Sequence, residues 1–212
     1  MSDLNHRSTS EILLALVRAH PEERMSIQDI IDGLGERSFG FVLLLFGIAS
    51  AVAPPGVATF TAIPLMFFGL QMLARYRTPW LPRSIAMRSF VKADLEKTIL
   101  RGVPTMRWIE RFCRPRLLFL IGPLGERLLG LLIFILAVVI ALPGPLTNAP
   151  PGFAIAFMSI AIIERDGLLV FAGVVASMFA LYLGFLGLHL VIEHVLPGVW
   201  EFLVSTWQLI AG

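Results

Sequence analysis

Charged residues are scarce in this sequence, and cysteine is almost absent. Of 212 residues, 15% are charged and 57% are hydrophobic, and the mean hydropathy is +0.81. This composition lies far from that of a soluble globular domain and predicts a protein surrounded by lipid. The single cysteine, Cys113, excludes an internal disulfide and a multi-cysteine metal site. The net charge of +2 is too small to indicate a nucleic-acid partner.

Motifs that carry enzyme chemistry are also missing. The sequence has no Gly-x-Ser-x-Gly, no Walker loop and no dinucleotide-binding fingerprint. The spacing of His189, Glu193 and His194 matches neither HExxH nor HxxEH, so a helix end explains these residues better than a zinc site does. We therefore expect no catalytic residues, no bound metal and no cofactor, and we predict that the protein is not an enzyme.

Basic residues concentrate in two regions. Of the 17 Lys and Arg residues, four lie in residues 1–37, twelve lie between Arg75 and Arg127, one is Arg165, and none follows it. Because Lys and Arg mark loops on the cytoplasmic side, this distribution predicts a cytoplasmic N-terminus and a C-terminus on the outer side of the membrane.

Proline and glycine divide the apolar part of the chain into helical hairpins. The first has arms at Ser38 to Ala53 and Val57 to Ala74, and the second has arms at Leu128 to Leu142 and Phe153 to Ile163. Each of the longer arms measures roughly 22 to 27 Å as a helix, less than the roughly 30 Å of a hydrocarbon core. The hairpins are therefore either short tilted spans or re-entrant loops. Leu168 to Leu190 is long enough to span without such help.

The fold class that follows is an all-α polytopic membrane protein, with two hairpins and a C-terminal transmembrane helix. We divide the chain into an amphipathic N-terminal region (1–37), a first hairpin (38–75), a basic loop (76–127), a second hairpin (128–166), and a C-terminal helix with its tail (167–212).

Amphipathic helices are expected on the cytoplasmic side. Ser10 and Ser26 are candidate N-caps, and Ser26 with Asp29 resembles a capping box. In the basic loop, apolar residues recur every four positions from Met87 to Ile99. These helices either lie on the inner membrane surface or pack against another protein segment.

The two hairpins resemble each other at an offset of 90 residues. Leu34-Gly35-Glu36-Arg37 with Gly40 recurs as Leu124-Gly125-Glu126-Arg127 with Gly130. The match extends to Pro55 with Pro145, Phe67 with Phe157, and Arg75 with Arg165. We interpret this as an internal duplication. Charge counting favours parallel repeats, whereas many transporters use inverted ones.

The proline breaks of the hairpins are the candidate solute or ion site, because a helix break leaves main-chain dipoles unpaired. Its residues are Pro54, Pro55, Gly56, Thr59, Thr61, Pro143, Gly144, Thr147 and Asn148. Turns at the membrane surface are the alternative.

Charged and polar residues near the inner ends of the hairpins are the candidate cytoplasmic vestibule. They are Glu36, Arg37, Gln71, Arg75, Glu126, Arg127, Glu164, Arg165 and Asp166. Ion pairs at the interface and helix-end charges are the alternative, and Gln71 is expected to bond to another helix.

Several segments together resemble the ExoD exopolysaccharide-synthesis family of bacterial membrane proteins. They are Ile30 to Gly40, Pro54-Pro55-Gly56, Ile63-Pro64-Leu65, Gln71-Met72, Pro79-Trp80-Leu81-Pro82 and Glu164-Arg165-Asp166-Gly167. The resemblance implies a bacterial inner-membrane protein linked to polysaccharide production, and it supplies no catalytic residues.

Two functions are open. The first is a small transporter-like or channel-like protein, a homodimer, with its site at the two breaks. The second is a non-transporting accessory protein whose basic inner face contacts polysaccharide synthesis or export proteins. The lipid bilayer is the common partner in both.

Overall fold

The computed structural model describes residues 9–54, 56–113, 117–195, 197–198, 204 and 207–208. Helices dominate, as the sequence predicts. The longer helices are α1 (Thr9–Ala19), α2 (Ile27–Leu34), α3 (Ser38–Val52), α4 (Val57–Leu73), α6 (Lys92–Phe112), α7 (Pro123–Ala141), α8 (Ala149–Glu164) and α9 (Gly167–Leu190). The short elements are β1 (Arg24–Ser26), η2 (Gly35–Arg37), α5 (Arg83–Ala86), β2 (Ser89–Val91), η3 (Leu118–Ile121) and the π-helical turn η4 (Val191–Val195).

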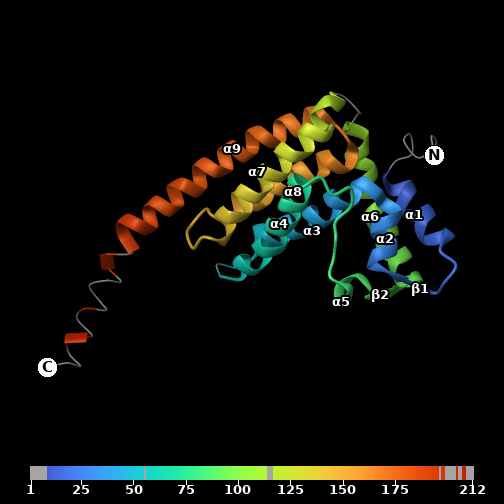
Figure 1. The fold of residues 1–212 in the computed structure, drawn as a ribbon, viewed down its shortest axis with the longest axis horizontal. Coiled ribbons are helices and arrows are strands. Elements are labelled where there is room, and N and C mark those ends of the chain that lie inside the picture. The colour runs from blue at the N-terminus through green and yellow to red at the C-terminus, as the bar shows by residue number, and fades with distance from the viewer. Residues whose placement is uncertain are drawn as a thin grey trace.

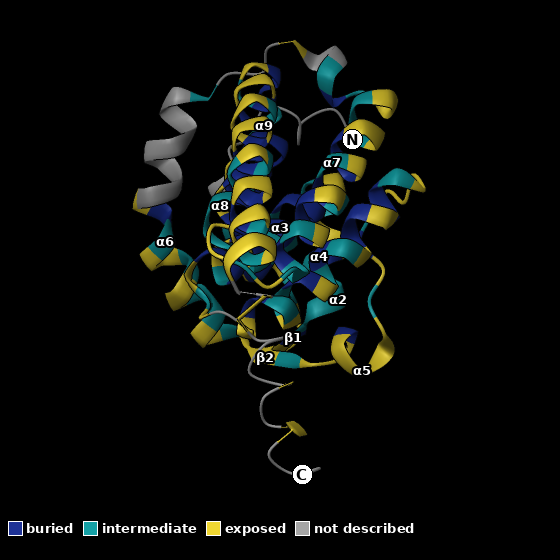
Figure 2. Ribbon diagram, turned by 90° about the vertical axis from the view of Figure 1, so that its left-hand side faces the viewer, coloured by how far each residue is buried: buried dark blue, intermediate teal, exposed yellow. Residues whose placement is uncertain are grey.

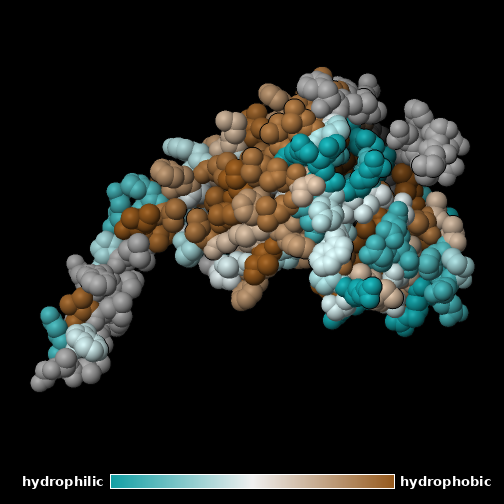
Figure 3. All heavy atoms as spheres, in the orientation of Figure 1, coloured by the Kyte–Doolittle hydropathy of each residue, from teal (hydrophilic) through white to brown (hydrophobic). Residues whose placement is uncertain are grey.

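The molecule has an apolar and a polar part. Helices α3, α4, α7, α8 and α9 form the apolar part, which we call the bundle, and α1, α2, α5, α6 and the two strands form the polar cap at one end of it (Figure 1). Hydrophobic side chains cover the visible face of the bundle, whereas hydrophilic ones gather on the cap (Figure 3).

The bundle has the dimensions and surface of a membrane domain. Three stretches, Ile27–Val52, Pro123–Ala141 and Gly167–His194, are long and apolar enough to cross a bilayer. Exposed residues run along α9 (Figure 2), and they include Phe171, Phe179 and Phe185. Because large exposed aromatic side chains along a whole helix are unfavourable in water and favourable in lipid, the bundle is the membrane-associated part.

Each arm of one hairpin packs mainly against an arm of the other, α3 against α8 and α4 against α7. Small residues allow this close approach. A Cβ on Gly47 would stand 3.1 Å from the carbonyl oxygen of Gly152, and a Cβ on Gly69 would stand 2.9 Å from that of Gly130. Apolar helices in lipid associate through such close backbone contacts between small residues. The core that results contains fully buried side chains of Leu43, Leu65, Ile133, Leu136, Ile140, Ile155 and Met158.

The polar cap is built by the N-terminal region and the basic loop together. Strands β1 and β2 pair antiparallel, with Met25 opposite Phe90. Helix α6 lies against α1, where Leu13, Val17 and Val103 are buried. The Arg18 Nε atom donates to Glu96 Oε1 at 2.9 Å across this contact. Of the two alternatives for the amphipathic helices, packing on another segment of the chain is the one observed here.

One predicted helix begins later than expected. The four-residue apolar period suggested a helix from Met87, but Ser89–Val91 is a strand and α6 starts at Lys92. The reason is tertiary, since residues 89–91 pair with 24–26 and a single amphipathic period cannot reveal a strand partner 65 residues away. The capping box at α2 is confirmed, with Asp29 N donating to Ser26 Oγ at 3.1 Å and Ser26 N donating to Asp29 Oδ2 at 2.8 Å.

The repeated Leu-Gly-Glu-Arg motif adopts two conformations. In its first copy, Gly35 has φ +56°, caps the end of α2 and begins η2. In its second copy, the motif lies inside α7, which begins at Pro123, five positions before the predicted arm. A proline in the first turn starts a helix readily, because its missing amide would be unpaired there anyway. The longer α7 is therefore among the helices that can span.

Candidate functional site

Four charged residues from both hairpins gather at the cap end of the bundle. Glu36 lies in η2 and Glu126 in the first turn of α7, whereas Arg75 and Arg165 follow the last turns of α4 and α8. The Arg165 Nη1 atom is 3.4 Å from Glu36 Oε2. Charges on Glu36, Arg75 and Arg165 all act on the partly buried Glu126 carboxylate. The bundle thus brings together four of the nine predicted vestibule residues.

Local backbone geometry positions the two arginines. Both have a left-handed backbone conformation, with φ +66° at Arg75 and +54° at Arg165. A left-handed residue ends a helix because it turns the chain away from the helical path. Each arginine therefore marks the point where an apolar helix stops and the chain turns.

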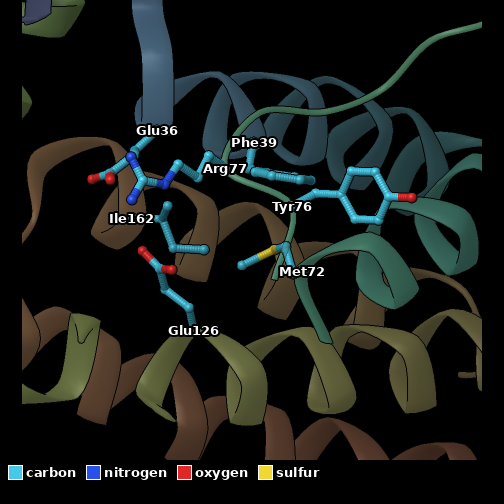
Figure 4. A pocket seen from close by; sticks show the side chains of 7 residues that line it. All are labelled: Glu36, Phe39, Met72, Tyr76, Arg77, Glu126 and Ile162. Atoms are coloured by element: carbon cyan, nitrogen blue, oxygen red, sulfur yellow. The ribbon is translucent and has the colours of Figure 1, made fainter. Parts of the chain in front are cut away.

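A small cavity lies between the charged side chains. It is lined by Glu36, Phe39, Met72, Tyr76, Arg77, Glu126 and Ile162 (Figure 4). Arg77 points toward Glu36, and the Tyr76 ring points the other way (Figure 4). The volume of about 20 Å³ suffices for one ordered water. Sequence reasoning did not include Arg77 in the vestibule, although its position in the basic run before Pro-Trp-Leu-Pro is a usable signal.

Two other predicted vestibule residues have structural partners. The Gln71 Nε2 atom donates to the carbonyl oxygen of Trp80 at 3.0 Å, and Gln71 Oε1 accepts from the Trp80 amide at 2.7 Å. Gln71 therefore bonds to the loop after its own helix, and the expected bond to another helix is wrong. Asp166 is buried and caps α9, with its Oδ1 accepting from Leu168 N at 2.9 Å. Arg127 is exposed, whereas Arg37 and Glu164 are partly buried.

The break of the first hairpin is a tight turn between α3 and α4. Pro54 ends the helical stretch, Pro55 lies outside the described residues, and Gly56 has φ +87°, a conformation that favours glycine. Thr61 Oγ1 donates to Ala58 O at 2.7 Å and lies 2.6 Å from Ser50 Oγ. The bond between Ser50 and Thr61 ties the two arms of the hairpin together.

The break of the second hairpin comprises residues 142–148 and is closed by a buried threonine. Thr147 has no exposed surface, and its Oγ1 lies 2.7 Å from the carbonyl oxygen of Gly144 and 2.9 Å from that of Leu142. Asn148 Oδ1 is 3.3 Å from the same hydroxyl. The Thr147 hydroxyl of this break is thus engaged within the turn itself. The following helix begins at Ala149, four positions earlier than the predicted arm, because prolines are tolerated in a first helical turn.

The two breaks lie at the same end of the bundle, away from the cap (Figure 1). Thr59 Oγ1 donates to Ala141 O at 3.5 Å, which joins the start of α4 to the end of α7. Helix α9 continues alongside, and a Cβ on Gly187 would collide with the carbonyl oxygen of Pro145.

An aromatic notch that the sequence analysis did not identify lies beside the charged cluster. It has a volume of about 280 Å³ and is lined by Phe67, Gln71, Tyr76 and Trp80. The Phe67 and Trp80 rings meet edge to face with centroids 6.0 Å apart. Tyr76 lines both this notch and the charged cavity.

Among the described residues, no group of three or more His, Cys, Asp or Glu side chains could hold a metal ion. His189 Nε2 lies 3.2 Å from Glu193 Oε1, one helical turn away, and its ring stacks on Phe185.

The sequence of the chain is similar to those of known proteins. The family model "Exopolysaccharide synthesis, ExoD" matches residues 9–186. Protein ExoD of Rhizobium meliloti is 32% identical over 175 residues, which cover 80% of this chain and 72% of the relative. An uncharacterized protein of Synechocystis is 27% identical over 146 residues, covering 68% of this chain and 69% of the relative. No solved structure matches the chain.

Proposed function

Because the chain belongs to the ExoD family of exopolysaccharide-synthesis proteins, we propose that it is a non-transporting accessory protein of polysaccharide synthesis or export, anchored in the inner membrane of a bacterium. In this proposal the bundle is the anchor. The polar cap is the part that contacts the synthesis or export proteins.

The observation that carries this proposal is that the buried polar side chains of the bundle are hydrogen-bonded. In the described part of the chain, every buried side-chain nitrogen or oxygen atom has a hydrogen-bond partner. A solute site lined by polar side chains would instead offer unpaired side-chain groups to its ligand. Buried Ser159 and Ser177 donate to carbonyl oxygens of their own helices at 2.7 Å. The bundle is therefore suited to anchoring.

The depth of the second break supports the same proposal. Gly187 packs against Pro145 and lies about 20 residues after the start of α9, or roughly 30 Å along the helix. This distance is about the thickness of the hydrocarbon core. It favours hairpins that cross the bilayer and turn near its far surface over re-entrant tips that meet at its centre.

The orientation in this proposal follows from charge. The cap holds most of the basic residues, and the described part of the chain after Arg165 has none. The cap and the N-terminus therefore face the cytoplasm, and the C-terminus faces the periplasm.

Site-specific crosslinking in a polysaccharide-producing host tests the accessory role. A photoreactive residue at Thr98, exposed on α6 of the cap, should form adducts with a subunit of the synthase or exporter. The same residue at Phe179, exposed on α9, is the matched control and should not. Cap adducts confined to lipid and to the chain itself would contradict the proposal.

Transport is a second candidate function, and the charged cavity is the observation that favours it. Glu126 of one hairpin and Glu36 of the other line a water-sized space beside Arg77. Such a group can relay a proton or bind a small ion at the inner end of a membrane bundle.

Purified protein in liposomes separates the two functions. Ion or proton flux that is lost in Glu126→Gln and kept in Asp32→Asn, an exposed carboxylate on the cap, would support transport. Tight liposomes together with restored polysaccharide production by Glu126→Gln in a deletion strain would support the accessory role.

The duplication is part of the proposal, and equivalent contacts support it. In the first copy, a Cβ on Gly40 would meet the carbonyl oxygen of Ser159 and the amide nitrogen of Ile163. In the second copy, a Cβ on Gly130 would meet the carbonyl oxygen of Gly69 and the amide nitrogen of Leu73. All three positions correspond at the 90-residue offset. Since α3 runs parallel to α7 in this arrangement, the contacts favour parallel repeats.

A homodimer is the remaining element of the proposal. An apolar groove of about 550 Å³ between α3, α8 and α9 offers a surface to a second copy, and its lining includes Leu44, Ile48, Phe153, Phe157, Phe179 and Leu183. Disulfide crosslinking in membranes of Phe179→Cys in a Cys113→Ser background should yield a covalent dimer. Ala15→Cys on the cap is the control, and a monomer from both variants would contradict the proposal.

A further inference from the structure

The segment that follows α4 folds back along that helix. Arg75 reverses the chain with its left-handed backbone, and the Tyr76 amide donates to Gln71 O at 3.0 Å. Gln71 then holds Trp80 through two hydrogen bonds. The Trp80 ring reaches Phe67, six residues before the end of α4. The chain therefore turns back and lies beside the last turns of α4 before it enters the cap.

We call residues 75–91 the hook, because they leave the bundle, turn back and continue through α5 to β2 (Figure 1). The far end of the hook is held by β1, and Arg24 Nε donates to Ser89 Oγ at 3.0 Å. Both ends of the hook are thus fixed to the body of the protein, which presents its middle as a preformed surface.

The hook carries an excess of positive charge. It contains four arginines and no acidic residue, and the next acidic residue along the chain is Asp94. Arg83 and Arg88 are exposed, and within the described part of the chain neither forms an ion pair. Excess positive charge next to a membrane span is complementary to anionic lipid headgroups on the cytoplasmic side.

The same segment exposes large apolar side chains. The exposed fractions are 57% for Trp80, 45% for Ile85, 70% for Met87 and 49% for Phe90. Isolated exposed apolar residues are ordinary, but here four of them alternate with arginines within eleven positions. An apolar surface interleaved with basic residues is the composition of interfacial membrane anchors, in which the apolar groups enter the headgroup boundary and the cations remain at the phosphates.

We propose that the hook inserts Trp80, Ile85, Met87 and Phe90 into the anionic leaflet on the cap side of the membrane, with Arg83 and Arg88 at the lipid phosphates. Contact with lipid sets the angle between the cap and the membrane. The inference rests on the proposed orientation of the cap toward the cytoplasm, since that leaflet supplies the anionic lipid.

The lone native cysteine makes a direct test practical. In a Cys113→Ser background, Met87→Cys is labelled with a polarity-sensitive fluorophore and the full chain is reconstituted. One set of vesicles contains phosphatidylglycerol, and the other contains only phosphatidylcholine. Ala15→Cys on α1, also exposed, is the matched position on the cap.

In phosphatidylglycerol vesicles the label at residue 87 should emit at a shorter wavelength and be quenched by a nitroxide on the lipid headgroup. In phosphatidylcholine vesicles both effects should weaken. Arg83→Gln with Arg88→Gln should abolish the dependence on anionic lipid, whereas Lys97→Gln with Arg101→Gln, an equal loss of charge on exposed positions of α6, should preserve it. The label at residue 15 should emit at the longer wavelength typical of water and remain unquenched in both vesicle types.

A label at residue 87 that stays in water in both vesicle types would overturn the proposal. The same holds if quenching is unchanged by the arginine substitutions, or if protection at residue 87 arises only on adding a soluble protein fraction. The readout involves no polysaccharide, so its result is independent of whether the accessory role holds.

Discussion

Gly130 of α7 faces Gly69 of α4 where the two helices cross, and a Cβ on Gly130 would stand 2.8 Å from the Gly69 carbonyl oxygen and 2.7 Å from Leu73 N. The third close atom is the Met72 Cβ at 2.7 Å, which is fixed to the backbone, so the helices themselves must move apart to admit a methyl group. This contact joins the first hairpin to the second and therefore determines how tightly the bundle closes.

Gly130→Ala should destabilise the protein by about 1–3 kcal/mol, the usual range for overpacking a tight core. Thermal unfolding in detergent micelles measures the effect. Gly102→Ala is the matched control, because a Cβ there meets no atom within 4 Å and alanine favours a helix by about 1 kcal/mol over glycine. Equal unfolding temperatures for the two variants would mean that the crossing is looser than described.

Gln71→Met should loosen the hook from the bundle. The substitution retains the length of the side chain but removes both hydrogen bonds to the Trp80 main chain. A lost partner for a buried polar group costs about 1–3 kcal/mol. Limited proteolysis should cut residues 75–91 faster in the variant than in the parent. Thr98→Val, which removes a hydroxyl from an exposed position of α6, is the control. Identical cleavage in the parent and in Gln71→Met would contradict the role of Gln71 in holding the hook.

Thr147→Val should weaken the turn between α7 and α8. Valine matches the shape of threonine but leaves the carbonyl oxygens of Leu142 and Gly144 without their hydroxyl donor, a loss of about 1–3 kcal/mol. Thr147→Ser keeps the donor and should remain close to the parent. The comparison uses unfolding temperatures in detergent. A serine variant as unstable as the valine variant would show that the methyl group, and not the hydroxyl, stabilises the turn.

The ion pair between Glu36 and Arg165 should contribute little to stability. Its atoms are 3.4 Å apart and its side chains are 53% and 36% exposed, so water screens the attraction. A double-mutant cycle with Glu36→Gln and Arg165→Gln should give a coupling energy below about 1 kcal/mol. A much larger coupling would indicate that the cluster is shielded from water in the membrane.

The ends of the helices in the first hairpin were well predicted because their signals are local, whereas α7 and α8 begin earlier than predicted. The first hairpin was expected at Ser38 to Ala53 and Val57 to Ala74, and α3 and α4 occupy Ser38–Val52 and Val57–Leu73. Pro54 and Gly56 interrupt the helix by their own backbone chemistry, whatever surrounds them. The capping box at Ser26 was predicted for the same reason.

Side-chain roles at the candidate site were predicted only in part. Charge pattern indicated that Glu36, Arg75, Glu126 and Arg165 lie at one end of the hairpins, and the structure brings them together. The same reasoning placed Gln71 against another helix, whereas it bonds to Trp80, nine residues along the chain. A polar residue in an apolar helix signals that a partner exists, but the identity of that partner depends on how the chain turns back.

By itself, the sequence determined the helical, membrane-associated class of the protein and the limits of the two helices in its first hairpin. These properties depend on composition and on interactions between residues a few positions apart. Only the tertiary structure decided that α3 pairs with α8, that β1 pairs with β2, and that the Thr147 hydroxyl bonds within its own turn. Those outcomes depend on contacts between distant segments, whose free energy arises only when the whole bundle and cap pack together.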